Sequence, residues 1–386
     1  MPGNALVRYV QSVLPALGVR GVPVVTFAGW SRATRLRLLP GTGRKYNDDT
    51  PDSVTRIKKH PAMLKLLDAY VAEQVEEAEE ELAGLPLRAE AILTKWYEME
   101  KIALVPRLRN LFRWLRTSNL SPEARIAAES RIKFLGQRAS DTIEDWADVM
   151  TDEGRLWRYL EPAGVRKSSV AATVRWCLDQ ELEAPIEVDE RVSDLDGRKL
   201  DEDSRAGCYD VEDDPILLRL IQLKRGALSA KKVNPISFAH VAIDEAQDRS
   251  AIEVKILLDA TEAESNYSKE KSVTIAGDTA QRLVFDNGFN GWDDLLAQTG
   301  NGSVVVHPLK LSYRSTAEVM ALAREILGPK LAPADPLVAR SGAPVELHQF
   351  GDVGEAVAFL AEALRALVAL EPGASIAVLA RYPEQA

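Results

Sequence analysis

Two acids at the end of an apolar run are the first candidates for chemistry in this chain. The segment HVAIDEAQD at 240–248 contains the run Val241–Ile243, followed at once by Asp244 and Glu245. Such a run predicts a buried strand, and open α/β sheets place ligands at the carboxyl ends of their strands. Hydrolysis of a nucleoside triphosphate needs a carboxylate for Mg²⁺ and a second acceptor that orients the attacking water. Asp244 and Glu245 supply both groups, although an isolated Asp-Glu pair is more often two solvated acids.

Two further segments carry groups that suit the same chemistry. SVTIAGDTAQ at 272–281 predicts a second strand, with Asp278 at its end and the neutral amide of Gln281 directed at the same nucleotide. LKLSYRST at 309–316 predicts a strand and then a helix start, with Arg314 just before the helix. An arginine in this place can reach a transferring phosphoryl group from a second domain. Taken alone, it is more often a surface residue or a salt-bridge partner.

These three segments, in this order and spacing, resemble motifs II, III and IV of the UvrD/Rep class of superfamily 1 DNA helicases. NALVRYVQSVLPALG at 4–18 is similar to the stretch after the phosphate loop in the helicase IV and HelD-like branch. VVTFAGWS at 24–31 resembles motif Ib, and DDPILLRLIQLKRG at 213–226 also looks HelD-like. The 4–18 and 213–226 segments each predict a helix that ends at a glycine.

The resemblance implies ATP and Mg²⁺ as cofactors and assigns roles to single residues. Asp244 would bind Mg²⁺, and Glu245 would act as the general base. Arg314 would be an arginine finger. Contacts with the nucleotide or its attacking water are implied for Gln247, Asp278 and Gln281.

The resemblance also implies residues that touch a nucleic-acid strand. In the family the Thr-Phe pair of motif Ib, here Thr26 and Phe27, makes such contacts. Aromatic residues after motif III stack on bases, and Phe285 and Trp292 are the nearest candidates. The tyrosine expected after Gln281 is absent, so core packing is the better interpretation of Phe285.

The pattern of elements predicts an α/β protein with an insertion. We expect a RecA-like (P-loop NTPase) parallel-sheet domain at 1–39 and 216–305, a mainly helical insertion at 40–215, and the N-terminal part of a second RecA-like domain at 306–386. Apolar runs predict strands at 22–27, 240–244, 272–278, 303–313 and 375–380.

Charge is unevenly distributed along this chain of 386 residues with net charge −10. A helical pattern at 66–85 is strongly acidic and is expected to be a solvated surface helix. The stretch 101–140 holds nine basic residues and two acids with interleaved aromatics, which fits either a nucleic-acid surface or an ordinary core with solvated arginines. The acid-rich segment 187–214 is expected to be a mobile loop or an ordered excursion between domains.

Composition excludes several classes of protein. No apolar run approaches the roughly 20 residues that a bilayer span needs, and the N-terminus lacks the layout of a signal peptide, so we expect a cytoplasmic protein without a membrane partner. The two cysteines, Cys177 and Cys208, do not have the spacing of a metal site.

The sequence contains no phosphate-binding loop of the form Gly-x-x-x-x-Gly-Lys-Ser/Thr. PGTGRKYND at 40–48 fails because its glycines and Lys45 are wrongly spaced and Tyr46 stands where the Mg²⁺-binding hydroxyl should be. We therefore expect a fragment of a larger helicase-like protein that lacks the Walker A loop and motifs V and VI.

Three hypotheses of function follow. The first is an ATP-driven helicase or translocase on single-stranded or partially duplex DNA, which the basic aromatic stretch favours. The second is a HelD-like ATPase that binds and remodels RNA polymerase, which the long acidic insertion favours. The third is an inert scaffold, because a site without backbone N–H groups around the phosphates should bind ATP weakly.

Overall fold

The computed structural model of the chain divides into two compact units, Met1–Val306 and His307–Ala386. The described residues are 4–40, 42–43, 46–47, 49–181, 207–265, 268–282, 284, 287–302, 304–309, 311–328 and 337–380.

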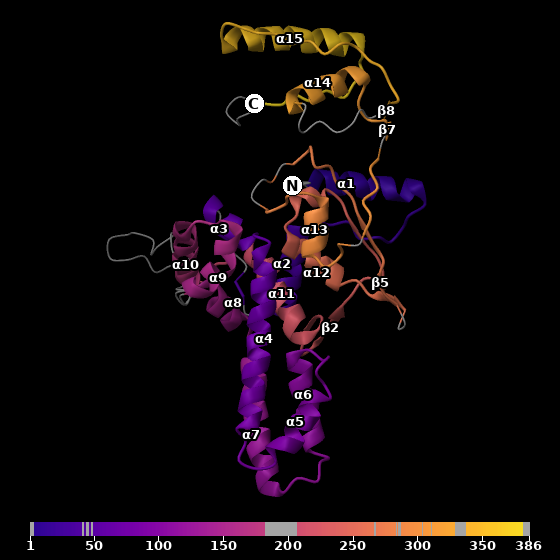
Figure 1. Ribbon diagram of the computed structural model, residues 1–386. Coiled ribbons are helices and arrows are strands. Elements are labelled where there is room, and N and C mark those ends of the chain that lie inside the picture. The colour runs from indigo at the N-terminus through magenta and orange to yellow at the C-terminus, as the bar shows by residue number, and fades with distance from the viewer. Residues whose placement is uncertain are drawn as a thin grey trace, which may run out of the picture. The chain divides into compact units, whose positions relative to one another are not determined.

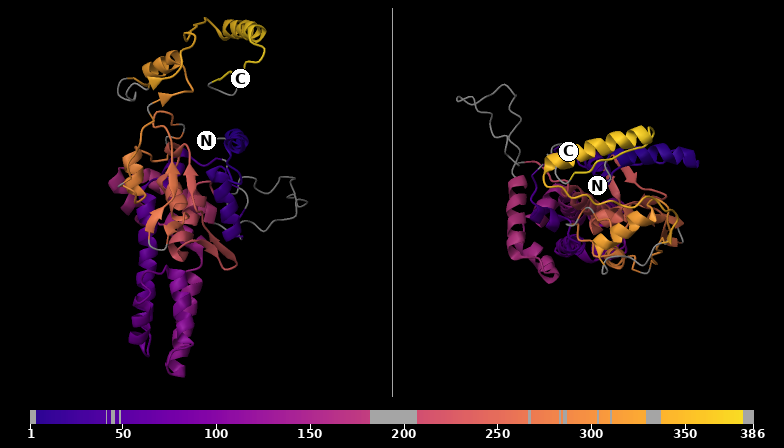
Figure 2. Two further views of the ribbon diagram at one scale, coloured as in Figure 1. Left: turned by 90° about the vertical axis from the view of Figure 1, so that its right-hand side faces the viewer. Right: turned by 90° about the horizontal axis from the view of Figure 1, so that it is seen from above.

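The first unit is mostly helical (Figures 1 and 2). Its α-helices are α1 (Asn4–Val13), α2 (Phe27–Leu38), α3 (Asp52–Lys58), α4 (Ala62–Ala83), α5 (Ala89–Tyr97), α6 (Leu104–Leu115), α7 (Pro122–Arg138), α8 (Thr142–Met150), α9 (Glu153–Leu160), α10 (Lys167–Glu181), α11 (Asp213–Arg225), α12 (Ala251–Asp259) and α13 (Trp292–Gln298). Short 3-10 turns occupy η1 (Leu14–Leu17), η2 (Glu161–Ala163) and η3 (Ala246–Asp248).

The sheets of the first unit are small. β3 (Val241–Ile243) pairs in parallel with β6 (Val273–Ile275). β1 (Leu228–Ala230) pairs antiparallel with β2 (Val233–Ile236), and β4 (Ala263–Ser265) pairs antiparallel with β5 (Ser268–Lys271). The protein is therefore mixed α/β, with two-stranded sheets among the residues that the structure describes.

The helices predicted at 4–18 and 213–226 are confirmed. α1 and η1 cover Asn4–Leu17, and Gly18 ends them with a φ of 79°. α11 ends at Arg225, and Gly226 caps it with a φ of 77° while its N–H donates to the carbonyl of Gln222. Glycine adopts this left-handed conformation without steric cost, which is why both helices stop there.

The strand predicted at 22–27 is wrong. Residues 22–26 precede α2, which begins at Phe27, and Val22 and Val25 are 55% and 59% exposed. The hydroxyl of Thr26 accepts a hydrogen bond from the N–H of Gly29 at 3.1 Å, so Thr26 caps α2. A capping side chain and the lack of a neighbouring strand in the described part of the chain outweigh the β-branched run.

The strands predicted in the last segment are largely wrong as well. The second unit contains α14 (Ala317–Leu327), α15 (Val353–Leu370) and the short parallel pair of β7 (Leu311–Ser312) with β8 (Leu337–Val338). Residues 304–309 and 375–380 form no strand. Their apolar side chains are mostly exposed, as at Leu309 (97%) and Leu379 (93%). Strand formation at these residues would therefore gain little free energy from side-chain burial.

α4, α5, α6 and α7 lie side by side as an elongated helical bundle (Figures 1 and 2). This bundle has its own hydrophobic core, with Leu82, Ile92, Trp96 and Leu111 fully buried. A second, larger core is formed by β3 together with α2, α3, the first half of α4 and α8 to α13. Most of the long acidic pattern at 66–85 thus lies in α4, the helix that belongs to both cores and ends at Ala83.

The acidic face of α4 is paired rather than only solvated. Carboxylates spaced four residues apart on this helix meet arginines of α7 and α9, because side chains at that spacing share one helix face. The pairs are Glu73–Arg155, Glu77–Arg138 and Glu81–Arg131.

Part of the acid-rich segment 187–214 is a buried ionic cluster. Residues 182–206 lie outside the described residues, but Asp210, Asp213 and Asp214 are fully buried. Their counterions are Lys58, 2.6 Å from Asp210 and 2.7 Å from Asp213, and Arg35, 2.5 Å from Asp214. We call these five residues the buried junction, and its position shows that this end of the segment is neither mobile nor solvated.

Neutral donors complete the buried junction. The indole N–H groups of Trp146 and Trp176 donate to Asp213 and Asp210, each at 2.9 Å. Burial alone would lower the pKa of Lys58, but the charges of Asp213 and Asp210 outweigh it and raise that pKa, so Lys58 is charged. The junction ties α2, α3, α8 and α10 to the start of α11.

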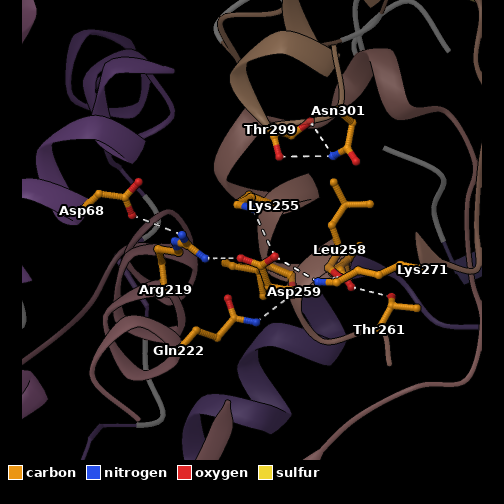
Figure 3. Close-up of polar contacts among 12 residues, drawn as sticks. Asp68, Arg219, Gln222, Lys255, Leu258, Asp259, Thr261, Lys271, Thr299 and Asn301 are labelled. Atoms are coloured by element: carbon orange, nitrogen blue, oxygen red, sulfur yellow. Dashed lines mark hydrogen bonds and ion pairs between the residues drawn. The ribbon is translucent and has the colours of Figure 1, made fainter. Parts of the chain in front are cut away.

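Asp259, at the end of α12, gathers three cations (Figure 3). Its carboxylate lies 2.6 Å from Arg219, 3.1 Å from Lys255 and 3.2 Å from Lys271. Burial acts to raise the pKa of Asp259, but Lys255 and Arg219 outweigh it and lower that pKa below its ordinary value. Arg219 also pairs with Asp68 of α4 at 3.2 Å, so α4, α11 and α12 are linked by charge.

Candidate active site

The parallel pairing of β3 with β6 brings the first two candidate motifs to one edge. The register places Ile243 beside Ile275, so both strands end at the same level. The backbone continues this pairing, because Ala276 donates to the carbonyl of Ile243 at 2.8 Å and Ala246 donates to that of Ala276 at 3.0 Å. We call this place the β3–β6 edge.

Glu245 turns the chain at the end of β3. Its φ of 50° and ψ of 45° are left-handed, which is uncommon for a residue with a side chain and is strained. Its N–H donates to the carboxylate of Asp244 at 3.0 Å. Asp244 is exposed and Glu245 is half-buried, so the sharp turn presents both carboxylates at the surface.

Gln247 connects the two motifs. It is fully buried, and its side-chain N–H donates to Oε2 of Glu245 at 2.6 Å. Its Oε1 accepts from the backbone N–H of Asp278 at 3.1 Å. A single amide therefore sets the position of the Glu245 carboxylate relative to the loop after β6.

Gly277 allows this close approach. A Cβ at this position would lie 2.2 Å from Oε1 of Gln247, 3.0 Å from the ring of Trp292 and 3.1 Å from the N of Ala246. No side chain fits at these distances. Glycine is therefore required because neighbouring atoms leave no room for a Cβ, and not because the backbone has a positive φ.

Asp278 and Gln281 form the outer part of the edge. The Gln281 amide donates to Oδ2 of Asp278 at 2.8 Å, and the N–H of Ala280 donates to Oδ1 at 2.9 Å. Both side chains are exposed, like that of Asp244. The structure thus brings five of the predicted nucleotide-site residues together: Asp244, Glu245, Gln247, Asp278 and Gln281.

Asn287 is a residue of this site that the sequence did not reveal. It is 1% exposed, and its amide donates to the carbonyls of Gln247 at 2.7 Å and Arg249 at 3.3 Å. Its Oδ1 accepts from the N–H of Phe289 at 3.1 Å. Asn287 therefore anchors η3 to the loop before α13. An asparagine beside a glycine is typical of any turn, so its pattern carried no specific signal.

Trp292, predicted to contact nucleic acid, packs within the unit. It is half-buried at the start of α13, and its ring meets that of Phe289 edge-on at 5.5 Å. Phe285 lies outside the described residues.

The remaining predicted residues belong to the start of α2 and to the second unit. Thr26 caps α2, and the half-buried ring of Phe27 contacts that of Trp30 at 5.6 Å. Arg314 belongs to the second unit, where it is exposed and its carbonyl accepts from Arg340 at 3.3 Å. The helix start predicted after Arg314 is confirmed, because Thr316 occupies the N-cap of α14.

The donor set at the edge suits one kind of metal. Among the described residues, no group of three or more His, Cys, Asp or Glu side chains is arranged to hold a metal ion by itself. Mg²⁺ usually keeps several waters and takes one or two carboxylates together with substrate phosphates. The exposed Asp244, with Glu245 beside it, fits that pattern.

Neither a protein-family model nor a curated protein matches this chain. No helix among the described residues is long and apolar enough to cross a membrane.

Proposed function

We propose that this chain is the motor region of an ATP-dependent DNA helicase or translocase of the UvrD-like superfamily 1 class. The observation that carries the proposal is the bridge of Gln247, which joins Glu245 of one motif to Asp278 of the other at the end of a parallel strand pair. In this proposal β3 and β6 belong to a RecA-like domain, and the second unit begins another.

Mg²⁺-ATP, when bound, supplies the phosphoryl group that water attacks. Asp244 would hold the Mg²⁺ at the exposed end of β3. Glu245 would accept the proton of the attacking water, and the hydrogen bond from Gln247 keeps its carboxylate in place. Gln281 and Asp278, which hold one another, would face the nucleotide from β6. Arg314 would act from the second unit.

The surface of α6 and α7 supports DNA as the partner. Arg109, Arg113 and Arg116 are exposed at a spacing that places them on one face of α6. Lys133 and Phe134 of α7 are exposed too, and Phe134 is 54% exposed. Such a surface attracts a phosphate backbone.

The stretch 101–140 was expected to be either a nucleic-acid surface or an ordinary core with solvated arginines, and its aromatic side chains include examples of both. Phe112 and Trp114 pack against the core of the α4–α7 bundle, whereas Phe134 faces solvent. The acids of α4, which favoured an RNA-polymerase partner, are in part paired within the chain. DNA is therefore the partner that we propose.

The first test is ATP hydrolysis, measured with and without single-stranded DNA, on this chain and on any longer chain that its gene encodes. Because the sequence lacks a phosphate loop, we expect weak turnover by the 386-residue chain and DNA-stimulated turnover by a longer one. Glu245→Gln should abolish turnover, and Glu144→Gln, at an exposed position of α8, should leave it unchanged.

A separate test addresses the basic surface. Replacing Arg109, Arg113 and Arg116 by alanine together should weaken binding of single-stranded DNA and flatten its salt dependence, because fewer counterions are released.

Turnover that is insensitive to Glu245→Gln, or absent from every version of the chain, would contradict the proposed function.

A further inference from the structure

A polar cleft lies in the helical part of the first unit, among α4, the end of α7, α8 and α9. Its volume is about 340 Å³, which is within the range of small-molecule sites. A cavity of about 150 Å³ adjoins it and shares Gln74, Glu77 and Arg138 with it. None of the residues assigned to the β3–β6 edge lines either cavity.

The cleft carries an excess of negative charge. Four carboxylates line it against two guanidinium groups, so its side chains sum to −2. These groups are Glu73, Glu77, Asp148, Asp152, Arg138 and Arg155. Glu73 and Glu77 are paired with the arginines, and Asp152, which caps α9, also lies 3.7 Å from Arg155. Asp148 instead accepts a hydrogen bond from the hydroxyl of Tyr70 at 2.9 Å.

Gln74 lines both cavities and has a side-chain acceptor without a hydrogen-bond partner. It is 9% exposed, and its side-chain N–H groups donate to Asp145 at 2.7 Å and to the Tyr70 hydroxyl at 3.1 Å. The carboxylate of Asp145 can only accept, which fixes the orientation of the amide. Oε1 of Gln74 has no hydrogen-bond partner, and a buried acceptor left without a donor is unfavourable.

We propose that this cleft binds an organic cation with N–H donors at two charged ends, such as a polyamine or neighbouring lysine or arginine side chains of a peptide. An ammonium or guanidinium group would donate to Oε1 of Gln74, and its charge would offset the excess of carboxylates. A single metal ion does not fit, because no group of three acidic, His or Cys side chains in the described part of the chain is close enough to hold one. An extended cation can instead reach carboxylates that lie apart.

The experiment is titration of the 386-residue chain with spermidine and with 1,4-diaminobutane at low salt, followed by calorimetry. 1,4-Butanediol, which has the same length as the diamine without its charge, is the ligand control. Saturable binding of spermidine at one site per chain is expected, with none of the diol. A blocked dipeptide of two lysines distinguishes the sources, because a peptide partner predicts that it binds more tightly than spermidine and a free polyamine predicts the reverse.

Two variants locate the binding. Gln74→Leu removes the unused acceptor, and Asp148→Asn removes one charge while keeping an oxygen for the Tyr70 hydroxyl. Each should weaken spermidine at least tenfold. Gln222→Leu is a matched control, because Gln222 also has a buried Oε1 without a partner but does not line the cleft (Figure 3). Asp179→Asn, at an exposed position of α10, is the charge control.

The controls should bind spermidine within twofold of the unaltered chain. The proposal is overturned if spermidine does not saturate, or if it binds Asp148→Asn and Gln74→Leu as tightly as the unaltered chain. The second outcome would indicate diffuse attraction to a chain of net charge −10. Melting curves of all variants show whether Gln74→Leu is folded. If Gln74→Leu is unfolded, the affinity of Asp148→Asn for spermidine decides whether the cleft is the binding site.

Discussion

The buried junction and the β3–β6 edge are both built on adjacent acids, yet they have opposite environments. Asp213 and Asp214 are fully buried against cations from α2 and α3. Asp244 is exposed, and the partners of Glu245 come from its own turn, namely the Asp244 carboxylate and the Gln247 amide. The comparison teaches that counterions supplied from distant helices make an acid pair part of the core, and that their absence leaves its oxygens available to a ligand.

The largest expected effect tests the junction. Lys58→Met should destabilise the chain by about 3–5 kcal/mol, because it leaves Asp210 and Asp213 buried without their cation. Urea unfolding followed by circular dichroism measures this. Lys95→Met, which removes a cation paired at 2.6 Å with the 56% exposed Glu98 side chain, is the control and should cost far less. Equal effects would mean that burial does not distinguish the junction.

The next effect tests the packing of the edge. Gly277→Ala should destabilise the chain by about 1–3 kcal/mol, because its Cβ would overlap the Gln247 amide. Gly136→Ala on α7 is the control, because no atom lies within 4 Å of its Cβ and alanine favours a helix. The control should be neutral or stabilising in the same urea titration. A neutral Gly277→Ala would show that the Gln247 bridge is not tightly packed.

Asp259 is intermediate in burial between the junction and the edge, and its contribution to stability should depend on pH. Because its pKa is lowered in the folded state, that state binds fewer protons than the unfolded chain below the ordinary value of 3.8. Its contribution is therefore present at neutral pH and is lost as the pH falls through the folded pKa. Asp259→Asn should lower stability by about 1 kcal/mol at pH 7, and the difference should vanish in acid. A difference that grows in acid would reverse the assigned sign.

The smallest expected effect tests strain at the edge. Glu245→Gly should raise stability by up to about 1 kcal/mol, because glycine adopts the left-handed conformation freely. The same change should remove any ATP hydrolysis by the chain. Glu144→Gly, within α8, should instead lower stability by about 0.5–1 kcal/mol. A loss of stability at position 245 would show that the Glu245 carboxylate holds the turn.

Local patterns in the sequence determined a good part of this protein. The helices at 4–17 and 213–225, their glycine caps, and the parallel strands at 241–243 and 273–275 follow from periodicity and capping chemistry, which act over a few residues. The order of the motifs also placed Asp244 and Asp278 at the ends of two strands, which meet at one edge because parallel strands share a direction.

The tertiary structure alone decided which polar groups are buried and what surrounds them. The acids of 210–214 belong to a segment expected to be a mobile loop or an ordered excursion between domains, but Lys58 and Arg35, more than 150 residues away, make their burial favourable. The β-branched run at 22–26 pairs with no strand among the described residues, so it forms the segment before α2 and not a strand. The unused acceptor of Gln74 arises in the same way, since pairing depends on neighbours that only the fold brings together.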